Sequence, residues 1–150
     1  MNIINLKENI PFLEEYIKLC NKEWGTKKNK EDLDSYVKRK LNQIYNTNKV
    51  ICVLGLINNN ELIGFISLFK NDGDYRLDLT PWYATMYIKE EYRKRGYSKI
   101  LNDALIKEAV KLGYDRVYLK TDLINYYEKF GAKYIEKLKN GEKLYYIKCI

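Results

Sequence analysis

The stretch that decides the fold is Ile88-Lys89-Glu90-Glu91-Tyr92-Arg93-Lys94-Arg95-Gly96-Tyr97-Ser98-Lys99, where an apolar strand is followed by a helix. Upstream of it, the run from Thr80 to Ile88 has the composition of a strand. Downstream, apolar residues recur at helical spacing from Arg95 to Leu112, and Gly113 ends that helix. A strand that passes directly into an amphipathic helix predicts a right-handed crossover to a parallel strand.

Three cations, Arg93, Lys94 and Arg95, stand together at the start of this helix. A helix N-terminus carries a partial positive charge, which disfavours each nearby cation by a few tenths to about 1 kcal/mol. An anionic ligand would offset this cost, because first-turn amides have no intrahelical partner. Gly96 and Ser98 are small enough to let a diphosphate approach those amides. The patterns GxxxxGK(S/T) and GxGxxG are both absent, so the sequence supports neither nucleotide hydrolysis nor dinucleotide reduction.

The hydrophobic periodicity changes along the chain from helical to extended and back. The expected elements are a strand (Ile3 to Leu6), a helix from Asn9 to Gly25, a helix from near Asn29 to Ile44, strands Val50 to Ile57 and Leu62 to Phe69, a loop (Asn71 to Asp78), the strand and helix given above, a strand (Val117 to Thr121), a brief helix (Asn125 to Phe130) and a hairpin of Lys133 to Leu138 with Lys143 to Cys149. This order predicts a mixed α/β chain of α+β character with mainly antiparallel strands.

A single domain accounts for residues 1–150. The chain has 150 residues and a mass of 18.0 kDa, and it shows no repeat and no Pro/Ser-rich linker. With 46% apolar or aromatic and 31% charged residues, it can bury a continuous core. The histidine count of zero excludes Ser/His/Asp and Cys/His nucleophile pairs and histidine-bound zinc. The net charge of +7 favours an anionic partner on average, although the placement of the cations matters more than their total.

Cysteine usage and hydropathy point to the compartment. Cys20, Cys52 and Cys149 form no CxxC pair, which favours three core thiols in a reducing compartment. No apolar run approaches the roughly 20 residues of a membrane-spanning helix. We therefore expect a cytoplasmic protein that uses neither a membrane nor a metal.

Two motifs resemble one known family. Arg93-x-x-Gly96-x-Ser98 after a strand is similar to the pyrophosphate loop of the GCN5-related N-acetyltransferase (GNAT) family, which has the form Gln/Arg-x-x-Gly-x-Gly/Ala. The segment 126–132, Tyr-Tyr-Glu-Lys-Phe-Gly-Ala, resembles the family's Phe-Tyr-Glu-Lys-x-Gly-Phe. The resemblance covers the second half of the chain in order and spacing, and the first half in topology. It implies a GNAT-type fold, in which about four helices flank a central, mixed, mainly antiparallel sheet of about seven strands.

The resemblance also implies acetyl-CoA as the acyl donor. In the family, the strand before the loop pairs through its backbone with pantetheine. This places Met86, Tyr87 and Ile88 along the cofactor, with an amide there polarising the acetyl carbonyl. The residues expected around the pyrophosphate are Arg93, Lys94, Arg95, Gly96, Tyr97, Ser98 and Lys99. Where the family often has an Asn that contacts pantetheine, this chain has Thr121 and Asp122, and we expect Asp122 to be the contact.

The resemblance assigns two catalytic roles. Tyr127 matches the tyrosine that protonates the leaving thiolate, although packing among neighbouring tyrosines is the alternative. Acetyl transfer needs a neutral amine, and Asp78 is the acid best placed to remove its proton, with a solvated surface loop as the alternative. Trp82 and Tyr83 either line the acceptor pocket or belong to the core.

These residues imply acetyl transfer to a primary amine by direct attack in a ternary complex. The acceptor stays open between a small-molecule amine and a peptide amine, and a homodimer is also open because dimers are common in the family. Cys52 as an acyl-carrying nucleophile is disfavoured, because it lies in an apolar strand without a basic neighbour. The alternatives from other classes are a CoA sensor without catalysis and a nucleic-acid-binding module. We expect no nucleic-acid partner, because the aromatics do not interleave with the cations.

Overall fold

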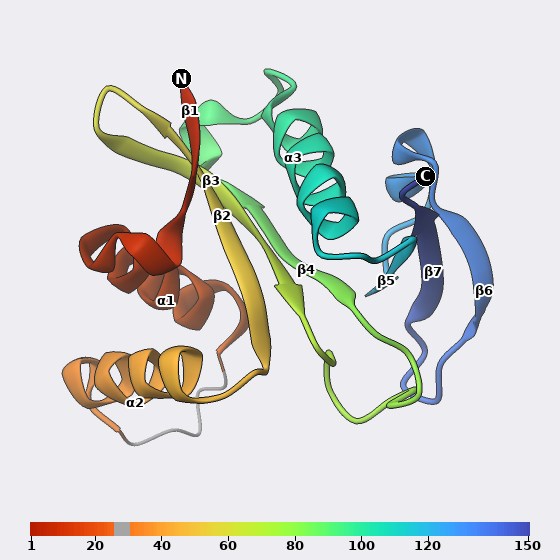
Figure 1. Cartoon of the computed structure of the whole chain (residues 1–150), viewed down its shortest axis with the longest axis horizontal. Coiled ribbons are helices and arrows are strands. Elements are labelled where there is room, and N and C mark those ends of the chain that lie inside the picture. Colours follow the sequence, from red (N-terminus) through yellow and green to blue (C-terminus); the bar gives the residue numbers. More distant parts are fainter. Residues whose placement is uncertain (26–30) are drawn as a thin grey trace.

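The computed structural model describes residues 1–25 and 31–150, which form a mixed sheet with helices on both faces (Figure 1). In chain order the elements are β1 (Asn2–Asn5), the 3₁₀ turn η1 (Leu6–Glu8), α1 (Ile10–Trp24), α2 (Leu33–Asn46), β2 (Val50–Asn58), β3 (Glu61–Phe69), β4 (Trp82–Ile88), the 3₁₀ turn η2 (Glu90–Tyr92), α3 (Tyr97–Lys111), β5 (Arg116–Thr121), the 3₁₀ turn η3 (Tyr127–Phe130), β6 (Lys133–Lys137) and β7 (Lys143–Lys148). The expected mixed α/β class is confirmed.

Side-chain caps define where the first two helices begin. The Asn9 side chain accepts a hydrogen bond from the Phe12 amide at 3.1 Å, as expected for the start of α1. The Asp32 carboxylate accepts one from the Ser35 amide at 2.8 Å and caps α2. The predicted helix start near Asn29 lies outside the described residues.

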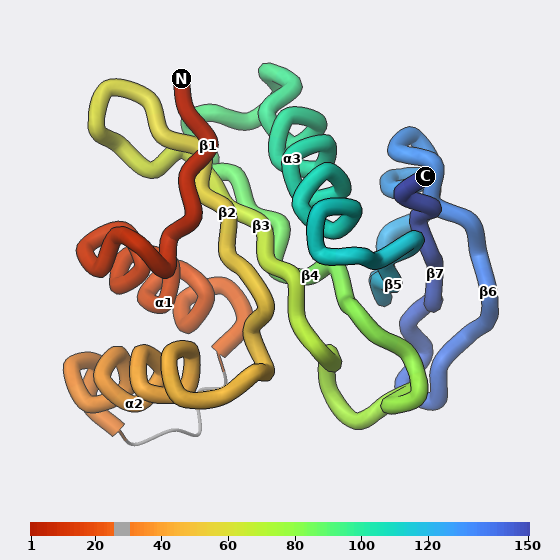
Figure 2. Tube along the Cα trace, viewed as in Figure 1, coloured from red at the N-terminus to blue at the C-terminus, as the bar shows by residue number. Residues whose placement is uncertain are grey.

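The strands are ordered β1-β2-β3-β4-β5-β7-β6 in one seven-stranded sheet within the described part of the chain. Neighbouring strands are antiparallel except β4 and β5, which are parallel and joined through α3. The expected parallel connection is therefore confirmed. Helices α1 and α2 cover one face of the sheet and α3 covers the other (Figure 1). The β6–β7 hairpin extends the sheet beyond β5 (Figure 2).

Each face of the sheet buries its own apolar cluster. On one face, Leu13 and Ile17 of α1 and Val37 of α2 pack against the sheet. On the other face, Leu101 and Leu105 of α3 do so. Each fully buried side chain of this size stabilises the fold by about 1.5–3 kcal/mol. These clusters attach all three helices to the sheet, and the position of α3 relative to β4 determines where the site forms.

A bulge interrupts the pairing of β3 with β4. The register is Ser67↔Ala84 on one side of it and Phe65↔Tyr87 on the other. Thr85 and Met86 thus oppose a single residue of β3. The extra residue inverts the alternation of faces: Tyr83 packs in the α3 cluster, while Tyr87, four residues later, packs against the α1–α2 cluster.

Two expected features differ in the structure. The brief helix predicted from Asn125 is the 3₁₀ turn η3, because Asn125 has a left-handed φ of +58° and its amide donates to the Glu128 carboxylate at 3.1 Å. Of the three thiols expected in the core, Cys52 is buried, whereas Cys20 and Cys149 are half-buried. Within residues 1–25 and 31–150, no helix combines the length and the apolar character that crossing a bilayer requires.

Candidate active site

The N-terminus of α3 leaves its first-turn amides without a side-chain cap. Its N-cap residue, Gly96, has a left-handed φ of +81° and no side chain to offer, in contrast to Asn9 and Asp32 in the other two helices. A Cβ at Gly96 would meet no atom within 4 Å, so the space above this turn is open. These amides are available to an anion, and the geometry fits a bound pyrophosphate.

The loop cations lie before α3, not inside its first turn. The expected direct passage from strand to helix is wrong, because η2 and a short loop separate β4 from α3. Arg93 Nε donates to the Ile88 carbonyl at 2.8 Å, and the Arg93 guanidinium lies 5.5 Å from the Tyr87 ring centroid. The Arg95 guanidinium lies 5.6 Å from the Tyr92 ring centroid. Arg93, Lys94 and Arg95 thus precede the N-cap of α3 and lie outside its first turn.

A groove of about 490 Å³ follows this loop, and we call it the loop groove. The sequence-predicted residues that line it are Met86, Tyr87, Ile88, Arg93, Lys94, Gly96, Tyr97 and Ser98. Arg95 and Lys99 lie outside it, and the Lys99 ammonium pairs with the Asp103 carboxylate at 2.6 Å. Sequence reasoning missed Lys129, which lines the groove with its ammonium 3.9 Å from the Tyr126 ring centroid. The sequence feature that could have predicted this position is the Glu128-Lys129 pair in the motif at residues 126–132.

A second space, the central cavity, has a volume of about 740 Å³ and lies where β4 and β5 separate. The parallel pairing of these strands is limited to Trp82 and Tyr118, and residues 84–86 and 119–122 line the cavity beyond that pair. The cavity and the loop groove adjoin, because they share Glu23, Trp24 and Met86. A molecule in the groove can therefore reach the cavity past Met86.

Tyr127 lines the central cavity together with Asp122. Its ring meets the rings of Tyr83 and Tyr126 edge-on, at centroid distances of 5.8 and 4.8 Å. Burial, and secondly the Tyr126 hydroxyl, raise the pKa of Tyr127 to about 12. Its hydroxyl is thus protonated at neutral pH and able to donate a proton.

The central cavity is acidic although the protein is basic overall. Among the residues that the structure describes, four carboxylates line it, from Glu23, Asp72, Asp122 and Glu142, together with one ammonium, from Lys120. Lys120 lies 3.8 Å from the Glu142 carboxylate, so this described lining carries an excess of negative charge. Burial raises the pKa of Asp72, Lys120 opposes that rise and Glu142 adds to it.

Asp78 does not line either space. Its exposed carboxylate accepts two hydrogen bonds from Arg76, at 3.0 and 2.9 Å, and Arg76 also pairs with Glu136. These bonds hold the pKa of Asp78 below its ordinary value. The structure brings Asp72, from the opposite end of the same loop, together with Tyr127. Sequence reasoning missed Asp72, because the loop holds several acids and its path decides which one turns inward.

The remaining candidates divide between core and cavity. Trp82 is fully buried in the core, and Tyr83, also buried, lies at the edge of the central cavity. Cys20 lines the cavity, whereas Cys52 does not, and burial raises the pKa of both thiols to about 12. Neither thiol is ionised at neutral pH, which disfavours a cysteine nucleophile.

A bulged strand that separates from its parallel neighbour, beside a helix N-terminus open to anions, defines the class of acyltransferases with a GNAT-type fold. The sequence model of the Acetyltransferase (GNAT) family matches residues 12–132. The chain belongs to this family.

Solved structures similar to the chain share its fold, and one curated protein is similar in sequence over part of its length. An aminoglycoside 6'-N-acetyltransferase complexed with coenzyme A is 20% identical with a TM-score of 0.75, and the match covers 100% of this chain and 98% of that one. The PaiA N-acetyltransferase of Thermoplasma acidophilum, in complex with coenzyme A, is 22% identical with a TM-score of 0.66 and 99% coverage of both chains. L-ornithine N5-acetyltransferase NATA1 of Arabidopsis thaliana is 32% identical over 82 residues, which span 51% of this chain and 36% of that protein.

Proposed function

We propose that this protein transfers an acetyl group from acetyl-CoA to a primary amine of a small cationic molecule, by direct attack in a ternary complex. One observation carries the proposal: a groove that can receive a diphosphate adjoins an acidic cavity that contains a protonated tyrosine. The groove accounts for the donor and the cavity for the acceptor.

In this proposal the loop groove holds the donor. The first-turn amides after Gly96 donate hydrogen bonds to the diphosphate, and Arg93, Lys94 and Lys129 add positive charge along the groove. The backbone of residues 86–88 pairs with the pantetheine arm and leads it past Met86 toward Tyr127. When bound, acetyl-CoA supplies the thioester.

In the central cavity the carboxylates attract an ammonium group, and Asp72 removes its proton. A carboxylate of raised pKa accepts a proton more readily than an ordinary aspartate does. The neutral amine then forms a bond to the acetyl carbon as the carbon–sulfur bond breaks, and Tyr127 gives its proton to the departing sulfur. The new amide nitrogen loses its second proton, which restores the hydroxyl of Tyr127. Of Asp72 and Asp78, only Asp72 lines the cavity, so we assign to Asp72 the role that the sequence predicted for Asp78.

The similar proteins support a small-molecule acceptor. One is named for ornithine and another for aminoglycosides, and both of these molecules carry more than one amino group. Several carboxylates in one cavity suit an acceptor with more than one positive charge.

The test is a thiol-release assay with acetyl-CoA and a matched panel of amines. 1,4-Diaminobutane is compared with 1-aminobutane, and ornithine, an aminoglycoside and a peptide with a free N-terminus are added. We expect rapid release with the multiply charged small molecules, slower release with 1-aminobutane, and little with the peptide. Binding of CoA without thiol release for any amine would indicate a sensor instead, and equal rates for the two butane amines would contradict the role of the carboxylates.

A further inference from the structure

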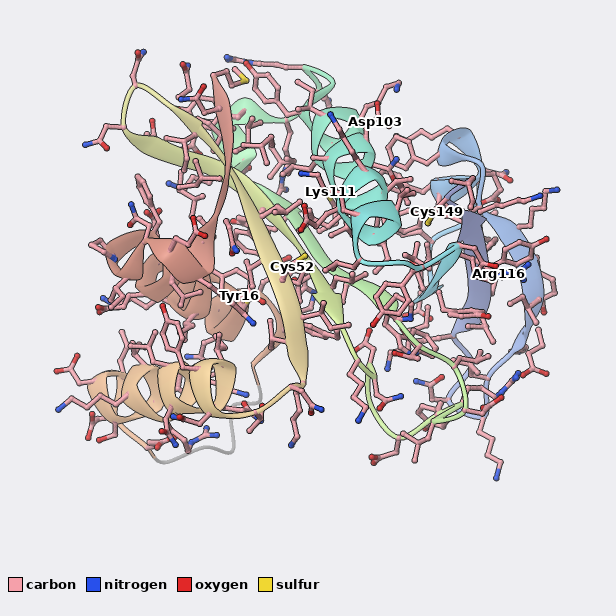
Figure 3. The ribbon with its side chains drawn as sticks, in the orientation of Figure 1. Tyr16, Cys52, Asp103, Lys111, Arg116 and Cys149 are labelled. Atoms are coloured by element: carbon pink, nitrogen blue, oxygen red, sulfur yellow. The ribbon has the colours of Figure 1, made fainter. Side chains whose placement is uncertain are left out.

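A buried chain of hydroxyl groups links α1 to the bulge of β4. The Tyr16 hydroxyl lies 2.8 Å from Ser67 Oγ, and the Thr85 hydroxyl donates to the same Ser67 oxygen. Tyr16 is 4% exposed and Ser67 is fully buried. Figure 3 shows Tyr16 extending from α1 toward the sheet. Three elements, α1, β3 and β4, therefore meet at one hydrogen-bonded cluster.

Thr85 has a backbone conformation that its side chain disfavours. Its φ of +52° lies in the left-handed region, which a β-branched residue rarely adopts. Such a conformation persists only where the surroundings hold it in place. The bond from Thr85 to Ser67, itself anchored by Tyr16, is a contact able to do so.

The conformation of Thr85 determines how the next residues face the site. Thr85 lines the central cavity, and Met86 lines both the cavity and the loop groove. Because the bulge inverts the alternation of faces, a regular strand at Thr85 would rotate residues 86–88 away from their present side. The backbone proposed to polarise the acetyl carbonyl thus depends on this one torsion.

We propose that Tyr16, Ser67 and Thr85 are positioning residues that hold the β4 bulge in its catalytic geometry. This inference rests on the proposed function, because the geometry matters for a thioester bound along β4. Tyr16 and Ser67 line neither the loop groove nor the central cavity, and Thr85, which lines the cavity, directs its hydroxyl to Ser67. They act through the backbone of Met86, so their loss lowers the rate of the chemical step much more than it weakens the binding of CoA, whose diphosphate is held at the start of α3 in the proposed function.

The kinetic test compares Thr85→Val, which removes the hydroxyl and keeps the branched shape, with Thr85→Ser, which keeps the hydroxyl. We expect Thr85→Val to lower kcat about tenfold or more. The backbone amide that donates a hydrogen bond to the acetyl carbonyl would be displaced, and a displaced donor loses much of its effect. KM for acetyl-CoA should stay within about twofold, and Thr85→Ser should retain most of the kcat. Tyr16→Phe, which removes the far end of the chain, should lower kcat in the same direction and decides the matter if Thr85→Val fails to fold.

The matched control is Tyr45→Phe. Tyr45 is an exposed residue of α2, and its hydroxyl donates to the Lys7 carbonyl at 2.6 Å, away from both spaces of the site. It should leave kcat unchanged. A wild-type kcat in both Thr85→Val and Tyr16→Phe, or an equal loss in Thr85→Ser and Thr85→Val, would overturn the proposal.

A second readout needs no acceptor amine. In infrared difference spectra of bound acetyl-CoA labelled with carbon-13 at the carbonyl, the wild type should shift the carbonyl stretch to lower frequency, and Thr85→Val should lose much of that shift. An unchanged shift in the variant would overturn the positioning role. If the wild type shows the shift but releases no thiol with any amine, the proposed transfer fails while the positioning role stands. If calorimetry detects no binding of acetyl-CoA, both proposals fail.

Discussion

Tyr127 keeps its proton at neutral pH because it is partly buried beside other hydroxyls. Burial disfavours the phenolate, and the neighbouring Tyr126 disfavours it further. A group of this kind donates a proton when a strongly basic atom forms next to it, and a departing thiolate is such an atom.

We expect Tyr127→Phe to lower kcat on the order of 10²-fold, the lower range of general-acid effects. The variant keeps the ring that packs against Tyr83, so the dissociation constant of CoA and the melting temperature should change little. Steady-state thiol release and calorimetry with CoA measure the two effects. Tyr134→Phe, a change on the exposed strand β6, is the control. Unchanged turnover would remove the acid role from Tyr127.

At the same scale, the raised pKa of Asp72 links the charge of its carboxylate to the stability of the fold. Burial raises the pKa of Asp72 above its ordinary value of 3.8, so the folded chain holds this proton to higher pH than the unfolded chain does. The contribution of the group to stability is complete below pH 3.8 and is lost as the pH rises through the folded-state pKa. At neutral pH the charged carboxylate therefore destabilises the fold.

Asp72→Asn should accordingly raise the melting temperature at pH 7 while lowering kcat/KM for a diamine. The gain in melting temperature should shrink as the pH falls through the folded-state pKa of Asp72, and it should be absent below pH 3.8. Asp78→Asn is the control, because Arg76 lowers the pKa of Asp78 and its removal should bring no gain. Thermal melts across pH check the sign, and a lower melting temperature of Asp72→Asn at pH 7 would contradict this account.

At the scale of elements, the two ends of α3 carry glycines with similar torsions and different surroundings. Gly96 and Gly113 have φ of +81° and +93°, and a Cβ would meet no atom within 4 Å at either position. An alanine at either position bears the same left-handed cost of about 1–2 kcal/mol. The pair therefore separates backbone strain from interference with a ligand.

Gly96→Ala should weaken CoA binding, whereas Gly113→Ala should not. Only Gly96 lies in the loop groove, where an added methyl group obstructs approach to the first-turn amides. Loss of one hydrogen bond to a charged phosphate is worth about 1.5 kcal/mol or more, or roughly tenfold in Kd. Calorimetry with CoA measures this, and equal weakening by both variants would place the diphosphate elsewhere.

For the whole molecule, the distribution of charge matters more than the total of +7. Cations gather around the loop groove, while carboxylates line the central cavity beside it. In the proposed function, a long-range positive potential draws the anionic donor toward the protein, and the local negative potential retains a cationic acceptor. One basic chain can thus bind partners of opposite charge.

Ligand-dependent melting tests this arrangement against nucleic-acid binding. At about 100 times its Kd, CoA should stabilise the fold by about 2.7 kcal/mol, which corresponds to roughly 5–10 °C in melting temperature. An oligonucleotide at the same phosphate concentration should produce no comparable shift, because the cations surround a groove and do not form an extended surface. A larger shift with the oligonucleotide, falling steeply with salt, would reverse the assignment.

Local patterns in the sequence were sufficient for most helices and strands and for the loop that we propose binds the donor. The Asn9 cap, the hydrophobic period and the Arg93-x-x-Gly96 spacing act over a few residues, so a linear reading detects them. The crossover from β4 to β5 through α3 follows from the same local order, because its handedness is set by the twist of the strands.

Only the tertiary structure decided which acid of the loop lines the cavity that contains Tyr127, and where β4 bulges. Asp72 and Asp78 belong to one loop and differ in which way the folded loop turns them, a matter of contacts with distant residues. The bulge depends on Thr85 meeting Ser67 and Tyr16, which lie 18 and 69 residues away along the chain. Neither the inward position of Asp72 nor the bulge at Thr85 exists before the chain packs, because burial and hydrogen bonding between separate elements create both features.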